Sequence, residues 1–338
     1  MNHSHRFAAF SGAVALTLLV SACGGGGDGY GSTAAPAAYT PAPVVSAPPP
    51  ALGPNSTQPL VAPGYSISAP LATGDTATDG FAEFNYRRQQ AGLSAVARNT
   101  NIDSAAAGHS NNQNVNDVIT HVQDPNKPAF TGVDVLARLT AARYIFNATS
   151  GYAYGEVISA SGDLSGVNNA EDLLTAIYHR FVILEPKFRE AGAGKVGVSP
   201  TGYNYFTVDF AANGLTGGVG AGQVGVYPFP GQVDVVPLFH NHQESPDPVP
   251  NQDGVGYPVS VHADIDAALS VTAFTIQARG GALLPTKLLS HATDAETPAS
   301  AAAIVPLTVL APRTVYDVLF SGNVSGINVS RIWSFTTR

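Results

Sequence analysis

The stretch AIYHRFVIL at residues 176–184 gives the clearest structural signal in this chain. With the residues before it, it repeats apolar side chains at helical spacing, which predicts one amphipathic helix packed against a sheet. Asn168 with Glu171 three residues later resembles a capping box, so we expect the helix to begin there. Its apolar stripe consists of Leu173, Leu174, Ile177, Tyr178 and Phe181.

Three polar residues stand out on and around this helix: His179, Glu156 in the motif Tyr-Gly-Glu, and His109 in the motif Ala-Gly-His-Ser. Two neutral imidazoles and one carboxylate are residue types that hold a divalent metal such as zinc. Each has a plainer interpretation as well, because helical histidines are usually core or surface residues and strand glutamates are usually exposed. A buried Glu156 would need a partner, since an unpaired buried carboxylate is very costly.

Helical patterns precede strand patterns in the first half of the chain. Helices are expected over 79–92, from Asn101 or Asp103 to 118, and over 133–144, and strands over 194–198 and 203–210. This order of elements indicates an α+β domain in three layers.

After residue 214 the pattern changes to short apolar runs about ten residues apart, which predicts an all-β sandwich. Tyr316 is placed like the tyrosine-corner residue of immunoglobulin-like sandwiches, and residues 332–337 resemble the last strand of a bacterial Ig-like domain. The expected strands cover 255–261, 269–277, 283–289, 303–309, 315–320 and 332–337.

Five motifs, in order over residues 78–211, resemble the CAP superfamily of cysteine-rich secretory, antigen 5 and pathogenesis-related proteins. The resemblance implies a three-layer α-β-α sandwich over 78–213, and the C-terminal strand pattern then predicts an inter-domain linker over 214–254 and an Ig-like β-sandwich over 255–338. The motifs are Phe84-Asn85-x-x-Arg88 with Gly92-Leu93, Ala107-Gly108-His109-Ser110, Tyr154-Gly155-Glu156, Tyr178-His179-Arg180, and Gly192-x-Gly194.

The resemblance also implies a groove lined by His109, Glu156 and His179, the same residues that would hold a metal. Tyr154 and Tyr205 are expected as wall residues of that groove, with ordinary core packing as the alternative.

The chain departs from the family in one respect. Eukaryotic members carry a second glutamate shortly before the last histidine, whereas residues 173–176 contain none, and Glu171 and Asp172 are expected to face solvent. A three-residue site would leave coordination positions open to water, or would hold no metal at all. His121 resembles a further family histidine and is expected to be structural, hydrogen-bonded to a backbone carbonyl.

The N-terminus resembles a bacterial lipoprotein signal. Residues 1–22 contain an apolar run that ends in Val-Ser-Ala before Cys23, so Cys23 is expected to carry lipid that anchors the chain in a membrane. The alternative is a plain signal peptide. Gly24 favours an outer-membrane or cell-surface lipoprotein, because it does not resemble the Asp that retains such proteins at the inner membrane. Residues 23–77, rich in Gly, Ala and Pro, predict a disordered tether.

The composition argues against a nucleic-acid-binding function and against disulfide bonds. The formal net charge is −8 and only 12% of the residues are charged, which argues against a nucleic-acid partner because no basic patch neutralises phosphates. Cys23 is the single cysteine, so the exported part must fold without disulfides.

Two further motifs are expected to carry no site. GAGQVG at 220–225 matches a dinucleotide fingerprint by letter, but the Tyr-Pro-Phe-Pro that follows cannot open a helix, so a flexible joint is expected. His240, His242 and Glu244 alternate like metal ligands on a strand, but the prolines after them indicate a loop.

The sequence leaves three functions open. The first is an exported, membrane-tethered module whose groove binds an unknown lipid, cell-wall fragment or protein. The second is a metal-dependent hydrolase in which His109 and His179 ligate the metal and Glu156 is the base or third ligand. The third is a scaffold in which the three residues form a closed hydrogen-bonded cluster. No Gly-x-Ser-x-Gly or His-Glu-x-x-His motif supports catalysis, and Ser110 points about 100° away from His109 on a helix.

Overall fold

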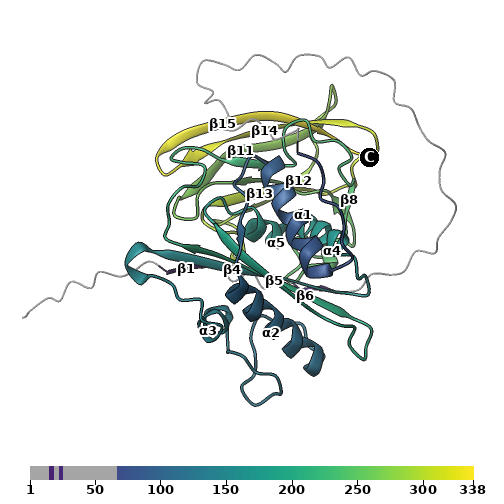
Figure 1. Ribbon diagram of the computed structural model, residues 1–338. Helices are drawn as coiled ribbons and strands as arrows, with labels where there is room; N and C mark the ends of the chain where they lie inside the picture. Colours follow the sequence, from purple (N-terminus) through teal and green to yellow (C-terminus); the bar gives the residue numbers. More distant parts are fainter. Residues whose placement is uncertain (1–14, 19–22, 26–66) are drawn as a thin grey trace, which may run out of the picture.

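The computed structural model describes residues 15–18, 23–25 and 67–338 (Figure 1). Most of the expected signal peptide and tether therefore lies outside the described residues. None of the helices in these ranges is long and apolar enough to cross a bilayer.

A mixed sheet forms the centre of the N-terminal half. β4, β6 and β5 are antiparallel neighbours, β3 pairs in parallel with β5, and two short strands from the N-terminus, β1 and β2, pair in parallel with the outer edge of β4. The bounds are β1 (Ala15–Leu18), β2 (Cys23–Gly25), β3 (Ala97–Arg98), β4 (Tyr152–Ser161), β5 (Glu190–Val196) and β6 (Asn204–Asn213).

Helices cover both faces of this sheet, which confirms the expected three-layer α-β-α sandwich (Figure 1). Gly192 and Gly194 let α2 lie directly on β5, because an added Cβ would come within 2.1 Å of Asp103 N and 2.0 Å of Ala107 N. One face carries α2 (Thr100–Asn116) and α3 (Val135–Ala141); the other carries α1 (Thr76–Gln90), α4 (Gly166–Thr175) and α5 (Ile177–Ile183). A short 3-10 turn, η1 (Ala148–Ser150), precedes β4.

The helix expected around residues 168–184 is broken in two. α4 ends at Thr175 and α5 begins at Ile177, and Ala176 between them has extended backbone angles, φ −67° and ψ 119°. The break leaves the first N–H groups of α5 without helical acceptors, and α5 has no side-chain cap from its own N-cap residue. A partner from elsewhere in the chain has to supply the missing acceptors.

Short polar side chains cap the other helices, at positions that differ from those expected. Asn99, not Asn101 or Asp103, caps α2, and Asp103 instead pairs with Arg98. Ser165, not Asn168, caps α4 by accepting a hydrogen bond from the Asn168 backbone N–H. Sequence spacing alone did not distinguish between neighbouring cap candidates.

The C-terminal residues form a β part of two main sheets, and every expected strand position there contains a strand. Tyr316 accepts a hydrogen bond from Ala311 N at 2.7 Å. One sheet has the order β12 (Thr286–Ser290), β13 (Ala301–Pro306), β10 (Val259–His262), β7 (Gly225–Tyr227), and the other β11 (Leu269–Ala278), β14 (Val315–Val324), β15 (Ile327–Thr336). A separate pair consists of β8 (Leu238–Phe239) and β9 (Val255–Gly256), with a 3-10 turn, η2 (Asn241–Gln243), between them.

The segment 214–254, expected as a linker, contributes β7 to the first of these sheets. Its glycine-rich stretch does not meet a phosphate. The backbone N–H groups of Val219 and Gly220 instead bind the carboxylate of Asp264 at 2.7 and 3.0 Å, so an internal anion occupies this loop.

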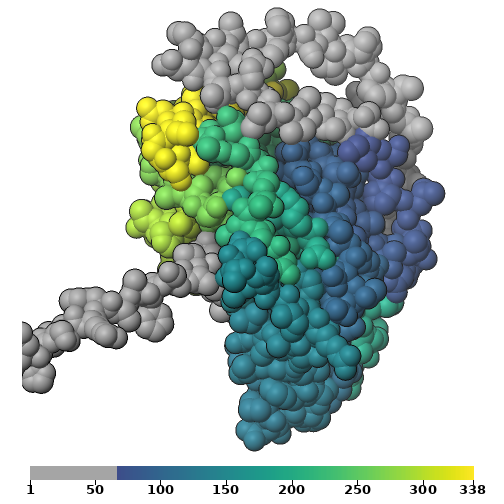
Figure 2. All heavy atoms as spheres, turned by 60° about the vertical axis from the view of Figure 1, so that its left-hand side comes forward, coloured from purple at the N-terminus to yellow at the C-terminus, as the bar shows by residue number. Residues whose placement is uncertain are grey.

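The two halves of the chain share one hydrophobic core. Arg180 on α5 is fully buried between the rings of Tyr227 and Tyr257, 5.0 and 4.7 Å from their centroids, and donates to the carbonyl of Pro258 at 2.6 Å. Such a desolvated cation–π arrangement contributes about 2 kcal/mol. Figure 2 shows the C-terminal residues, green to yellow, at one end of the molecule and the segment around α3, in teal, at the other. Among the described residues, this shared core joins the β part to α1, α4 and α5, and the separate apolar cluster on the α2–α3 side contains no residue of the β part.

A fragment that ends at Asn213 should lose cooperative folding, because it uncovers the α5 side of the shared core. We expect residues 67–338 to unfold in one thermal transition followed by circular dichroism. Residues 67–213 should show no such transition and should bind the dye ANS. A fragment 67–213 that unfolds cooperatively at the temperature of the longer chain would contradict this prediction.

Candidate functional site

The three expected site residues lie in two separate places, because β4 alternates its side chains across the sheet. Tyr154 and Glu156 face α2 and α3, whereas Gly155 faces α5, where an added Cβ would come within 2.7 Å of Val182. His109 on α2 therefore shares a face with Glu156, and His179 on α5 lies on the opposite face. We expected a single hollow lined by all three residues. The structure instead places them in two distinct polar clusters.

His109 is completely buried, and both of its ring nitrogens are bonded to protein groups. Nε2 lies 2.7 Å from the carbonyl oxygen of Thr120, and Nδ1 lies 2.8 Å from the amide nitrogen of Gln123. The first contact requires a proton on Nε2 and the second a lone pair on Nδ1, so the imidazole is neutral. Burial lowers the pKa of His109 to about 4, in agreement with that tautomer.

Glu156 is the anion at the centre of this cluster. Its Oε1 lies 2.7 Å from His121 Nδ1 and its Oε2 accepts from the Arg138 guanidinium at 2.6 Å, while His109 Nε2 lies 3.7 Å away. Burial alone would raise the pKa of Glu156, but Arg138 together with His109 and His121 outweighs it and holds the pKa below its usual range. The carboxylate is therefore ionised and matched by a buried guanidinium.

His109 and His121 exchange the roles expected for them. His121 was expected to bond a backbone carbonyl, but it contacts Glu156, and it is His109 that contacts a carbonyl. Nothing in the local sequence distinguishes the two, since each histidine lies near small or polar neighbours. The segment after α2 reverses direction and packs along the C-terminal half of α2. This reversal brings His121 to β4.

Asp209 is a member of the cluster that the sequence analysis did not select. It lies on β6 directly opposite Glu156 and is completely buried. Neither oxygen has a hydrogen-bond donor in the part of the chain that the structure describes. Burial, followed by the neighbouring Glu156, raises the pKa of Asp209 well above its usual range, so the surroundings favour the protonated form of its carboxyl. The sequence feature that could have identified Asp209 is its position as an acidic residue inside an otherwise apolar strand.

The residues present do not fit the divalent metal that the resemblance suggested. Within the described ranges, no three His, Cys, Asp or Glu side chains are grouped so that they could hold a metal ion. His109 has no free lone pair, Glu156 is bonded on both oxygens, and His179 lies across the sheet. This cluster is a hydrogen-bonded interior.

The aromatic wall residues also belong to the interior. Tyr154 stacks with Tyr152 and Phe146, at centroid distances of 6.4 and 5.9 Å. Tyr205 is 1% exposed, and its hydroxyl donates to Asp117 at the C-cap of α2. Both residues therefore pack the α2 side of the sheet.

His179, on the other face, is held by Glu244 from the segment expected to be a linker. The Glu244 carboxylate accepts from the backbone N–H groups of Ile177, Tyr178 and His179 at 2.8, 2.7 and 3.3 Å, and its Oε1 lies 3.2 Å from His179 Nδ1. This carboxylate supplies the acceptors that the break before α5 requires. Glu244 does not alternate with His240 and His242 on a strand, because residues 241–243 form the turn η2.

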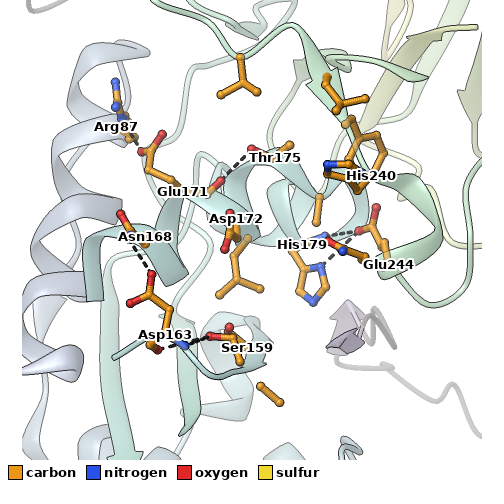
Figure 3. A pocket seen from close by; sticks show the side chains of 18 of the residues that line it. Arg87, Ser159, Asp163, Asn168, Glu171, Asp172, Thr175, His179, His240 and Glu244 are labelled. Carbon is orange, nitrogen blue, oxygen red and sulfur yellow. Dashed lines mark hydrogen bonds and ion pairs between the residues drawn. The ribbon is translucent and has the colours of Figure 1, made fainter. Parts of the chain in front are cut away.

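A pocket of about 1270 Å³ opens beside this pair (Figure 3). We call it the interdomain pocket, because α4, α5 and the end of β4 form one wall and residues 234–244 form the other. Figure 3 shows Asp163, Asn168 and Arg87 on one side, His179, His240 and Glu244 on the other, and Asp172 between them. Its apolar lining includes Ala160, Leu173, Ala176, Val236, Leu238 and Phe239.

Comparison with known proteins supports the family resemblance over part of the chain. Residues 81–210 match the family model CAP, described as the cysteine-rich secretory protein family. No curated protein matches the sequence.

Three solved structures are similar over less than half of this chain. An extracellular protein containing a SCP domain from Bacillus anthracis str. Ames has 23% identity and a TM-score of 0.34, over 43% of this chain and 45% of that one. An outer surface protein from Borrelia burgdorferi has 17% identity and a TM-score of 0.34, over 42% of this chain and 96% of its own. A cysteine-rich secretory protein from Staphylococcus aureus has 14% identity and a TM-score of 0.30, over 42% and 40%. The chain thus spans less than half the length of the Bacillus protein.

Two isosteric changes in the buried cluster should have opposite effects on stability. Glu156→Gln removes the anion that Arg138 requires and should destabilise the fold by about 3 kcal/mol or more at pH 7. Asp209→Asn should be neutral or stabilising there, because an amide keeps the shape of the protonated carboxyl and has no proton to lose. Chemical denaturation of both variants at pH 7 measures the difference.

The pH dependence provides a second readout. The raised pKa of Asp209 means that its contribution to stability is full below its unfolded value of 3.8 and is lost as the pH rises. Asp209→Asn should therefore flatten the decline of unfolding free energy above about pH 4. Destabilisation by Asp209→Asn, or none by Glu156→Gln, would contradict the assigned charge states.

Proposed function

We propose that this protein, whose residues 81–210 form a CAP domain, is an exported, membrane-tethered binding module whose ligand enters the interdomain pocket. The supporting observation is that pocket: about 1270 Å³, with both apolar and polar side chains in its lining. The ligand classes to test remain lipid, cell-wall fragment and protein.

Export and tethering rest on the N-terminal sequence. The apolar run before Cys23, and the small residues that precede it, support cleavage there and lipid attachment to the cysteine. Cleavage at this point would remove β1 and leave β2 at the start of the mature chain. Localisation in the cell envelope, at the outer membrane or cell surface, follows from the same proposal.

The hydrolase alternative receives less support from the geometry. It requires His109, Glu156 and His179 around one metal, and the sheet separates them. Binding requires only a preformed pocket, and the interdomain pocket is held by buried contacts from both halves of the chain. Glu244, Arg180 and Tyr257 supply those contacts.

Replacing Cys23 tests the tether. The Cys23→Ser variant, expressed with its own N-terminus in a bacterium, should no longer incorporate radiolabelled palmitate and should move from the membrane pellet to the soluble fraction. Ser46→Ala, in the expected tether, is the matched control and should leave both properties unchanged. Equal labelling of wild type and Cys23→Ser would exclude lipid on this residue.

Blocking the pocket tests the binding function. Gly162 lines the interdomain pocket, and an added Cβ there meets nothing within 4 Å, so Gly162→Trp should fill the pocket without disturbing the fold. Residues 67–338 should bind at least one of three probes: peptidoglycan sacculi, phosphatidylethanolamine–phosphatidylglycerol vesicles, or the peptide acetyl-Ala-Lys-Ala-amide. The substitution should weaken that binding about tenfold or more.

Gly197→Trp is the control for added aromatic surface, because Gly197 is equally open and does not line the pocket. It should bind like wild type in co-sedimentation and calorimetry. The proposal fails if the wild type binds none of the probes, or if Gly162→Trp binds as tightly as Gly197→Trp.

A further inference from the structure

We propose that the interdomain pocket recognises a peptide that carries a free amino group. This inference rests on the proposed function and adds the chemical class of the ligand to it. Three observations carry it: the imbalance of charge around the pocket, the position of the unpaired carboxylates, and the apolar surface beside them.

Acidic side chains outnumber basic ones on the pocket wall. The cations are Arg87 and Arg338, and the carboxylates are Asp163, Glu171, Asp172, Asp234 and Glu244. The whole chain has a net charge of −8, so its long-range field also attracts cations. A ligand that enters this pocket with an additional negative charge would be repelled.

Arg87 cannot neutralise the excess, because two carboxylates already share it. Its Nε lies 2.8 Å from Glu83 Oε1 and 2.7 Å from Glu171 Oε1. Burial, followed by the nearby Glu171, raises the pKa of Glu83 to about 7, as expected where two acids share one cation. Glu244 is equally committed, since it caps α5 and contacts His179.

One of the remaining acids, Asp172, lies in the C-terminal half of α4. Asp172 points into the pocket from the last turn of α4, between Asp163 and the His179–Glu244 pair (Figure 3). No side-chain hydrogen bond or ion pair holds its carboxylate among the described residues, whereas Asp163 is bonded to Asn168 and Ser165. The last carbonyls of α4, those of Leu174 and Thr175, already accept from the buried guanidinium of Arg180, so the attraction for a further cation comes from the Asp172 carboxylate itself. Asp172 is therefore the natural partner of an ammonium group.

The apolar lining indicates that the cation belongs to a larger molecule. Leu173 follows Asp172 on α4, and Val236, Leu238 and Phe239 face it from the opposite wall. Such a surface suits the methylene stem of an amine and small apolar side chains next to it. A volume of about 1270 Å³ exceeds the range of roughly 300–1,000 Å³ that is usual for small ligands, so a peptide of several residues fits better than a free ion or amine.

Two sources could present this chemistry: a lysine-containing segment of a protein, or the peptide part of the cell wall with its free amino groups. Both share a peptide backbone, small side chains and an ammonium group. The proposal concerns the shared chemistry, and the experiment below separates the sources.

The test compares probes that differ only in the amine. Residues 67–338 should bind acetyl-Ala-Lys-Ala-amide in calorimetry, native sacculi in co-sedimentation, or both, and should bind the Nε-acetylated peptide and N-acetylated sacculi about tenfold more weakly. Preference for sacculi would identify the cell wall as the source, and preference for the peptide would identify a protein. Each of these outcomes supports the proposal.

Asp172→Asn should cause the same loss with the unmodified probes, because it removes the carboxylate and keeps the shape of the side chain. Asp124→Asn, an exposed carboxylate outside the pocket, removes the same charge and should have no effect. Binding that Gly162→Trp abolishes, but that neither acetylation nor Asp172→Asn weakens, overturns the amine proposal and leaves the binding function standing. Binding of none of the probes overturns both.

Discussion

The carboxylate of Glu244 on the N-terminus of α5 is the contact on which the functional architecture depends. It accepts three backbone N–H groups and contacts His179, in a site where both side chains are completely buried. Because α5 has only seven residues and no cap of its own, it cannot begin at Ile177 without such an acceptor. Three features therefore depend on the same contact: the break between α4 and α5, the orientation of His179 and the position of segment 234–244. The interdomain pocket is the space that this arrangement leaves.

The opposite face of the sheet shows how a polar cluster is stabilised when it does not form a site. Glu156 is surrounded by Arg138 and His121, His109 bonds on both nitrogens, and the pKa of Asp209 is raised by burial. Each group has a charge state that suits its surroundings, so the cluster tolerates burial. In an open hollow these residue types would bind a metal. In this structure they hold α2, the segment after it and β4 together.

Local patterns predicted the elements better than they predicted the site. The strand at β6, the C-terminal strands and the three-layer order follow from short-range patterns, and the structure confirms them. The apolar stripe over residues 173–181 was also real, yet the helix is interrupted, because the interrupting carboxylate comes from Glu244, more than sixty positions away. The grouping of His109 with His179 failed for a similar reason, since it required knowing which face of β4 each helix covers. Spacing fixes a side chain's direction on its own element but not the element that faces it.

The dependence of α5 on Glu244 also changes what the β part contributes. The family match ends at residue 210, so Glu244, Tyr257 and the wall at 234–244 all lie beyond the region that the CAP family model describes. The Tyr178-His179-Arg180 motif lies inside that region, but residues outside it also contact the motif: Arg180 lies between Tyr227 and Tyr257, and Tyr178 donates to Asp294. A CAP domain without this β part would present the same motif in a different setting. The C-terminal half therefore forms part of the wall of the interdomain pocket, which is lined by residues from both halves of the chain.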